Sequence, residues 1–124
     1  MSAQAKYLFI AAMDVDPDKE ALFNEVYENE HIPLLLKVPG VLSIKRYATM
    51  PLTMVLGGET RTIVAEGEPR YSAVYEIESP DVLTSAAWAN AVDAGRWPGA
   101  SSHEAVENRE LLRRMKLRVL EFAK

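Results

Sequence analysis

The chain has 124 residues, is 48% hydrophobic and carries a formal net charge of −4 from 18 acidic and 14 basic side chains. This length fits a single domain over residues 1–124, in which roughly two-thirds of the unfolded surface can be buried. The chain contains no cysteine. A disulfide, a thiol nucleophile and a zinc–thiolate site are therefore excluded, and the composition is typical of a reducing compartment.

The two ends of the sequence bear on location and partners. Only a short apolar run precedes Asp14, too short for a secretory signal and far too short to span a membrane. We therefore expect a cytoplasmic protein without a membrane partner. The basic side chains cluster between residues 109 and 118, among leucines and acids. That pattern is typical of a solvated face or a subunit contact, so no nucleic-acid partner is predicted.

Residues 6–13 are predicted to form a strand that is apolar on both faces. One face carries Tyr7, Phe9, Ala11 and Met13, and the other carries Leu8, Ile10 and Ala12. A strand of this kind is covered on both sides. Helices can cover one face of its sheet, and the other face then needs a partner sheet or a ligand. We therefore expect a homodimer that forms through the sheet.

A helix is predicted over residues 17–30. Asp16 can cap it, and Pro17 suits its first position. Its apolar stripe runs at spacings of three and four and ends in a carboxylate and an imidazole: Phe23, Val26, Tyr27, Glu30, His31 and Leu34. Pro33 disfavours helical geometry at the preceding residue, so the helix is expected to kink or stop beside His31.

A strand over residues 41–48 follows and completes a recognisable pattern. The order Tyr27, His31, Pro33-Leu34, Pro39-Gly40 and a strand holding Arg46-Tyr47 resembles the EthD-like families of the dimeric α+β barrel superfamily. The resemblance implies an α+β fold: a ferredoxin-like βαββαβ single domain whose sheet pairs with a second copy, as a homodimer, to enclose a cavity. The resemblance supports the fold more strongly than a function, because function depends on the site residues that a fold carries.

The second half of the chain fits this outline. Residues 49–70 hold a Gly57-Gly58 pair between two β-prone runs, which predicts a hairpin extending two strands, with a mobile flap as the alternative. Alternation over residues 71–78 predicts a half-buried strand. A second helix is expected from Asp81 to Ala94, a short third helix over 103–113 and a last strand over 116–122.

His31 is the leading candidate for catalysis, because an imidazole alone among side chains titrates near neutral pH. Tyr27 precedes it by one helical turn and can position a substrate hydroxyl or relay a proton. The structural alternatives are a helix-end histidine that caps carbonyls and a tyrosine that belongs to the core. The resemblance favours the catalytic reading, since members with known activities often place a histidine in the cavity.

Five further residues are candidates for substrate binding: Arg46, Tyr47, Tyr75, Trp88 and Trp97. Arg46 can hold a carboxylate or enolate oxygen, and its alternative is a salt bridge with Glu76 or Glu78 on a neighbouring strand. Alternation along the strand does not settle whether Arg46 or Tyr47 faces a ligand.

Other chemistries have no sequence support. His31 and His103 lie in no H-E-x-x-H pattern, so no metal site is predicted. No G-x-S-x-G motif is present, and Gly57-Gly58 lacks the lysine of a phosphate-binding loop.

Two function classes follow. The first is a cofactor-independent enzyme of isomerase, cyclase or oxygenase type, acting on a small aromatic, polyketide-like or lactone compound with His31 as general acid/base. The second is a non-catalytic binding or accessory protein that holds a small hydrophobic metabolite. In both cases the resemblance implies the chemical class of the ligand rather than a particular reaction.

Overall fold

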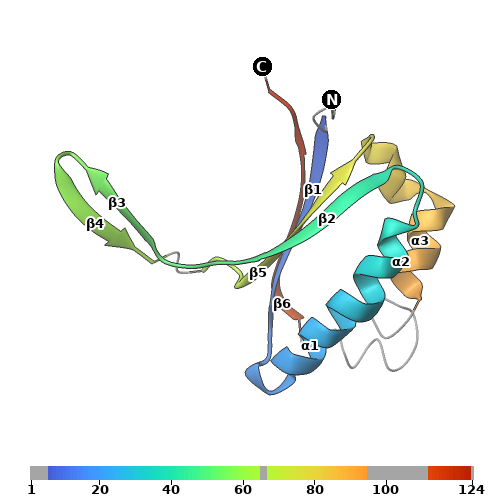
Figure 1. Ribbon diagram of the computed structural model, residues 1–124, viewed down its shortest axis with the longest axis horizontal. Helices are drawn as coiled ribbons and strands as arrows, with labels where there is room; N and C mark the ends of the chain where they lie inside the picture. Colours follow the sequence, from blue (N-terminus) through green and yellow to red (C-terminus); the bar gives the residue numbers. More distant parts are fainter. Residues whose placement is uncertain (1–5, 65–66, 95–111, 124) are drawn as a thin grey trace.

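The computed structural model describes residues 6–64, 67–94 and 112–123. Four strands form the main sheet: β1 (Tyr7–Val15), β2 (Val41–Ala48), β5 (Tyr71–Ile77) and β6 (Leu112–Glu121). They lie in the order β2-β5-β1-β6, and each neighbouring pair is antiparallel. Helices follow β1 and β5 and cover the same face of the sheet (Figure 1). This is the βαββαβ topology expected from the sequence, with one additional hairpin.

The helical segment after β1 does not end at His31. It comprises η1 (Pro17–Lys19), α1 (Glu20–Val26), the π-helical turn η2 (Tyr27–His31) and α2 (Ile32–Leu36). Of the two outcomes predicted beside His31, a kink or a stop, the stop is therefore wrong. Instead, the Ile32 N–H donates to the Tyr27 carbonyl five residues back. This wider turn accommodates Pro33, which has no N–H and would collide with a carbonyl in a regular α-helix.

The start of this segment also differs from the expectation. Asp16 occupies the cap position in an extended conformation, but its side chain makes no capping hydrogen bond. Its carbonyl accepts a hydrogen bond from the Lys19 N–H at 2.9 Å. The turn at the helix start is therefore closed by backbone, as a 3₁₀ turn.

The segment after β5 is divided where one helix was predicted. The 3₁₀ helix η3 (Pro80–Thr84) is followed by α3 (Ala86–Asp93). Ser85 separates them with an extended backbone, and its hydroxyl accepts a hydrogen bond from the Trp88 N–H at 3.1 Å. Serine is a strong N-cap, so it begins a new helix here. The predicted third helix lies mostly outside the described residues, although its end at 112–113 belongs to β6.

The register of the sheet separates its two faces. Phe9 of β1 pairs with Tyr75 of β5 and Val119 of β6, and these residues lie on the helix-covered face. Ile10, one residue later, pairs with Val74 and Arg118 on the opposite face, which we call the open face. The core is on the helix side. Its buried members are Ala11, Met13, Phe23, Val26, Tyr27, Leu35, Val38, Val41, Ala73, Tyr75, Ile77 and Val82.

The segment between β2 and β5 forms the predicted hairpin. Its strands are β3 (Leu52–Leu56) and β4 (Glu59–Ile63), joined by Gly57 and Gly58 with φ of 61° and 82°. Two successive residues at positive φ are typical of the type I′ turn that suits hairpin twist. The hairpin projects well away from the main sheet, on the side opposite the helices (Figure 1). Throughout the part of the chain that the structure describes, no helix is long and apolar enough to span a membrane.

Gly40, in the turn before β2, gives a testable prediction. It has φ of 93°, and a Cβ added there would collide with Cγ2 of Val82. Gly58 has φ of 82° and nothing near an added Cβ, so it is a matched control. We expect Gly58→Ala to lower the free energy of unfolding by about 1 kcal/mol through backbone strain. Gly40→Ala should cost roughly 1–3 kcal/mol more because of the overlap. Urea unfolding measures both, and equal losses would contradict the packing argument.

Candidate active site on the helix face of the sheet

His31 lies in the core, at the end of the π-helical turn. Its side chain is only 4% exposed, and its ring meets that of Tyr27 edge-on, with 5.0 Å between centroids. Burial lowers the pKa of His31 to about 3, because the charged imidazolium loses its hydration. The imidazole is therefore neutral at physiological pH and does not point outward to solvent.

Two tyrosine hydroxyls meet in the same part of the core, one of them on the tyrosine whose ring contacts His31. The Tyr27 and Tyr75 hydroxyl oxygens are 2.8 Å apart and share a hydrogen bond between the helix and β5. Burial raises the pKa of Tyr27 to about 12 and raises the pKa of Tyr75 well above its usual value. Both phenols therefore keep their protons at neutral pH. The hydrogen bond between the two hydroxyls uses one of these two protons.

Further aromatic rings pack around the pair. Tyr75 contacts Phe9 at 5.2 Å and Trp88 at 5.7 Å between centroids, and Phe9 meets Trp88 edge-on at 5.8 Å. We call Tyr27, His31, Tyr75, Phe9 and Trp88 the aromatic cluster. It draws on the π-turn, β1, β5 and α3, so the fold brings together residues far apart in sequence.

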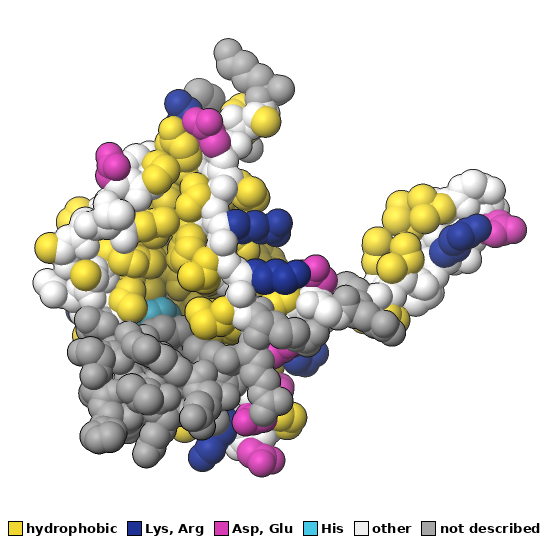
Figure 2. All heavy atoms as spheres, turned by 180° about the vertical axis from the view of Figure 1, so that it is seen from behind, with side chains coloured by type: hydrophobic (Ala, Val, Ile, Leu, Met, Phe, Trp, Pro, Cys, Tyr) yellow, Lys and Arg dark blue, Asp and Glu magenta, His cyan; other side chains and the backbone are white. Residues whose placement is uncertain are grey.

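An apolar surface adjoins the cluster at the β6 edge of the sheet. Leu117 and Val119 pair with Ala11 and Phe9 on the helix face, yet they remain 59% and 41% exposed. Figure 2 shows hydrophobic side chains gathered in a hollow on this side of the molecule. The hollow offers an apolar ligand a surface next to the cluster.

Arg46 forms the opposite rim of the cluster. Its guanidinium donates to Glu28 Oε1 at 3.0 Å and to Asn24 Oδ1 at 2.7 Å, and it lies 4.6 Å from the centre of the Tyr27 ring. The alternative predicted for Arg46, a salt bridge with Glu76 or Glu78, is therefore replaced by an ion pair with the helix. Arg46 pairs with Ala73 on the helix face, whereas Ser43 rather than Arg46 pairs with Glu76.

The structure thus joins five of the seven predicted site residues and separates one. His31, Tyr27, Tyr75, Trp88 and Arg46 lie together on the helix face. Tyr47 pairs with Ser72 on the open face and is 55% exposed, so it does not line the same cavity. Trp97 lies outside the described residues.

Sequence reasoning overlooked two contributors, Phe9 and Asn24. Phe9 lies at an alternating position of β1, and Asn24 lies one turn before Tyr27 and Glu28. Helical spacing could have placed Asn24 on the same side of the helix as Tyr27 and Glu28. The spacing alone does not show that Arg46 donates a hydrogen bond to Asn24.

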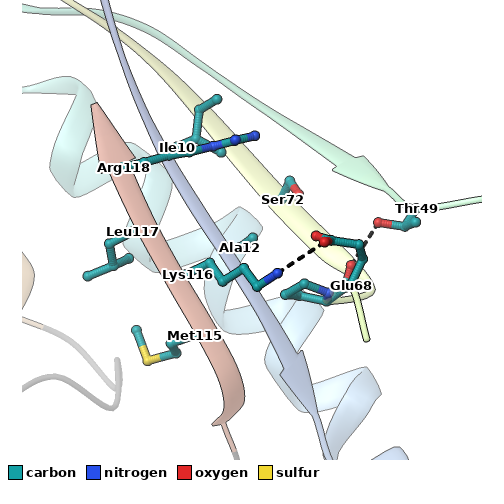
Figure 3. Close-up of a pocket in the computed structure, with 10 residues that line it drawn as sticks. Ile10, Ala12, Thr49, Glu68, Ser72, Met115, Lys116, Leu117 and Arg118 are labelled. Carbon is teal, nitrogen blue, oxygen red and sulfur yellow. Dashed lines mark hydrogen bonds and ion pairs between the residues drawn. The ribbon is translucent and has the colours of Figure 1, made fainter. Parts of the chain in front are cut away.

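A second hollow lies on the open face and is shown in Figure 3. Its volume is about 440 Å³, and its lining includes Ile10, Ala12 and Ser72. Lys116 Nζ bonds to Glu68 Oε1 across it at 3.0 Å. None of the candidate catalytic residues belongs to this hollow. Over the described ranges, no three histidine, cysteine or acidic side chains are grouped to hold a metal ion.

The tyrosine pair gives a second prediction. Tyr27→Phe or Tyr75→Phe leaves one buried hydroxyl without its present acceptor or donor, so each single change should lower the free energy of unfolding by about 1–3 kcal/mol. The double change removes both hydroxyls and should cost no more than either single change. Tyr47→Phe, on the exposed face, is the control and should change little. Additive losses would show that the two hydroxyls do not act as a pair.

The buried imidazole gives a third prediction. Unfolded His31 binds a proton below its ordinary pKa of 6.5, whereas the folded group does so only near pH 3. Its contribution to stability is therefore complete above pH 6.5 and is lost as the pH falls from 6.5 toward 3. We expect the unfolding free energy of the wild type to fall more steeply over this range than that of His31→Gln, as measured by urea titrations at several pH values. Parallel curves would contradict the burial of a neutral imidazole.

No family model matches the chain, and no curated protein matches it. Solved structures do resemble it. One is a crystal structure of an ethyl tert-butyl ether D (EthD) family protein from Bacillus halodurans, with 17% identity, a TM-score of 0.53, and coverage of 94% of this chain and 99% of that one. Another is the heme-degrader MhuD from Mycobacterium tuberculosis, solved with two hemes in its active site. It has 20% identity and a TM-score of 0.53, with coverage of 95% of this chain and 96% of that one. At these identities the similarity is one of fold. It confirms the predicted α+β, ferredoxin-like architecture and agrees with the EthD-like resemblance of the sequence.

Proposed function

We propose that this protein is a cofactor-independent enzyme that performs acid/base chemistry on a small aromatic, polyketide-like or lactone compound, with His31 as the acid/base. One observation carries the proposal: a neutral imidazole and two protonated phenols converge in a buried aromatic cluster beside an apolar hollow. Such convergence of titratable groups with shifted pKa values is typical of catalytic sites.

The protonation states fit proton abstraction from an acidic C–H or O–H. Neutral His31 accepts the proton, and the substrate becomes an enolate or phenolate. The resulting imidazolium is stabilised by the anion beside it, since an opposite charge in a poorly hydrated site strongly favours the charged form. The phenol pair of Tyr27 and Tyr75 supplies the hydrogen-bond donor for the anionic oxygen. Return of the proton from His31 to another atom of the substrate completes an isomerisation.

The surroundings restrict the substrate class. Trp88, Phe9 and the exposed apolar residues of β6 favour a flat or hydrophobic molecule. Arg46 is held by Glu28 and Asn24 at the rim, so its proposed role is to orient Tyr27 and favour negative charge near it, rather than to bind a substrate carboxylate. Arg46 and Glu28 are among the charges that act on the pKa of Tyr27.

Heme, which the MhuD structure holds, is a poor fit to the described residues. A histidine ligand to heme iron must present a ring nitrogen to a cavity that admits the whole macrocycle, which is far larger than the small substrates proposed here. His31 is 4% exposed and its ring is packed against Tyr27. The proposal therefore assigns no heme chemistry to this chain.

A second candidate function is the binding of a small hydrophobic metabolite without turnover. The deep burial of the polar groups supports this function, because His31, Tyr27 and Tyr75 are only 4%, 2% and 1% exposed. A ligand that occupies the hollow can contact the aromatic rings without reaching these groups. The difference between the two functions is whether a bound molecule reaches the imidazole.

We also propose that the protein is a homodimer that associates through the open face of its sheet. The centre of that face is apolar, with Leu8 and Ile10 from β1 and Val74 from β5. The helices of the described residues cover the other face (Figure 1). A second copy packed on this side would remove the apolar strip from water, as in sheet-on-sheet packing.

The fourth prediction tests the enzyme directly. Wild type, His31→Gln and Tyr47→Phe are incubated without added cofactor with phenols, enol-lactones and β-dicarbonyl compounds, and conversion is followed by NMR. We expect conversion by wild type and Tyr47→Phe, and a loss of about 100-fold or more in His31→Gln. Ligand line broadening that is equal in all three proteins, without conversion, would support the binding function instead. Heme is included in the panel as a separate ligand.

A further inference from the structure

The β3–β4 hairpin has a mainly apolar strand, β3, and a mainly polar strand, β4. On β3, Leu52, Met54 and Leu56 share one face and are 50%, 40% and 40% exposed, whereas Val55, which is 65% exposed, lies on the other face. Ile63 of β4 pairs with Leu52 and is 45% exposed. β4 begins Glu59-Thr60-Arg61-Thr62, and its Arg61 and Glu59 form an ion pair with each other at 3.3 Å. Hydrophobic side chains at this density on an exposed strand mark an interaction surface.

The hairpin has no cover within its own chain among the described residues. Every residue of both strands is exposed, and β3 and β4 form a separate two-stranded sheet that pairs with no strand of the main sheet. A two-stranded hairpin alone is at best marginally stable in water. Moreover, one edge of β3 carries unpaired backbone groups, which favour pairing with another chain. The hairpin therefore needs a partner.

The placement of the hairpin identifies that partner. It leaves the sheet on the side opposite the helices (Figure 1), which is the side of the open face. Its hydrophobic side chains lie along the side nearer the body of the molecule (Figure 2). The apolar strand and the open face thus border the same space. A body that packs on the open face would also meet β3.

We propose that the β3–β4 hairpin is a dimerisation arm, whose strand β3 packs against a second copy of this chain seated on the open face. This inference rests on the homodimer proposed above. The two-fold symmetry of such a dimer gives each copy one arm that holds the other copy. The balanced Glu59–Arg61 pair leaves the paired strands of the arm without net charge, so the arm brings no like-charge repulsion to the interface. The arm would account for the exposed hydrophobic residues of β3, which the domain core leaves uncovered.

The fifth prediction compares two matched changes in the arm. Met54→Asp places a charge on the face that Leu52 and Leu56 share, opposite Arg61, and Thr60→Asp places the same charge on the other face of the hairpin, opposite Val55. We expect Met54→Asp to raise the dimer dissociation constant roughly tenfold or more, through loss of buried apolar area, and Thr60→Asp to leave it within about twofold. Sedimentation equilibrium of the full chain measures the constants, and circular dichroism confirms that both variants fold. Ile10→Asp, at the centre of the open face, tests the dimer separately and should produce monomers.

The possible failures are distinguishable. A wild-type monomer would overturn both the dimer and the arm. A dimer that Ile10→Asp dissociates and Met54→Asp leaves equally tight would overturn the arm alone. A second measurement does not depend on a destabilising change: a photoreactive benzoylphenylalanine at position 54 is activated in a mixture of isotopically light and heavy chains. Crosslinks between light and heavy chains are expected, and crosslinks confined to single chains would overturn the arm.

Discussion

The hydrogen bond between the hydroxyls of Tyr27 and Tyr75 joins the helical layer to the centre of the sheet. At 2.8 Å it connects two of the largest fully buried side chains of the core. The one shared hydrogen bond gives both buried hydroxyl oxygens a polar partner. The position of His31 follows from this contact, because the imidazole is one turn along the same helix and its ring packs on Tyr27. Phe9 and Trp88 then close the space around Tyr75. Helix, sheet and candidate site therefore depend on one another.

Burial sets the electrostatic character of the cluster. It lowers the pKa of His31 and raises the pKa values of both tyrosines, so all three groups are neutral at rest. Full charges lie at the rim, where Arg46 is paired with Glu28. A site of this kind holds its functional groups uncharged until a substrate supplies or removes a proton. That property suits acid/base chemistry without a metal ion or an organic cofactor, and it equally suits the storage of an apolar ligand.

Much of the fold could be predicted from the sequence because one face of the sheet is buried. The alternation of Tyr71, Ala73, Tyr75 and Ile77 is produced by that burial and predicted β5 well, and β2 was predicted with the bounds that it has. The errors arose where tertiary contacts override local preference. Pro33 predicted a kink or a stop, and the stop is wrong because the chain continues through a π-helical turn into α2. Ser85 divides a helix whose composition had suggested a continuous one.

The site was predictable as a set of residue types but not as an arrangement. His31, Tyr27, Tyr75 and Trp88 were identified individually, whereas the pairing of the two hydroxyls depends on strand register. For Arg46 and Tyr47 the alternation fixed opposite faces but not which face was which. Only the pairing of β2 with β5, together with the helical layer, places Arg46 on the helix side. The ion pair with Glu28 depends on Arg46 facing the helices. From the sequence, Glu76 and Glu78 on a neighbouring strand were the predicted partners of Arg46.

The π-helical turn makes the site sensitive to chain length as well as to side-chain identity. A turn of this type holds one residue more than an α-helical turn, so it behaves as a single-residue insertion within an otherwise regular helix. Removal of Asn29 would turn the wide turn into an α-helical turn, and the residues beyond it would keep roughly their present direction, because the extra residue is already absorbed within one turn. His31 and the fully buried Leu35 would then stay on the side of the helix that faces the sheet. Homologous chains that lack one residue in this segment would thus keep the fold and the helix face and would differ in the backbone beside His31.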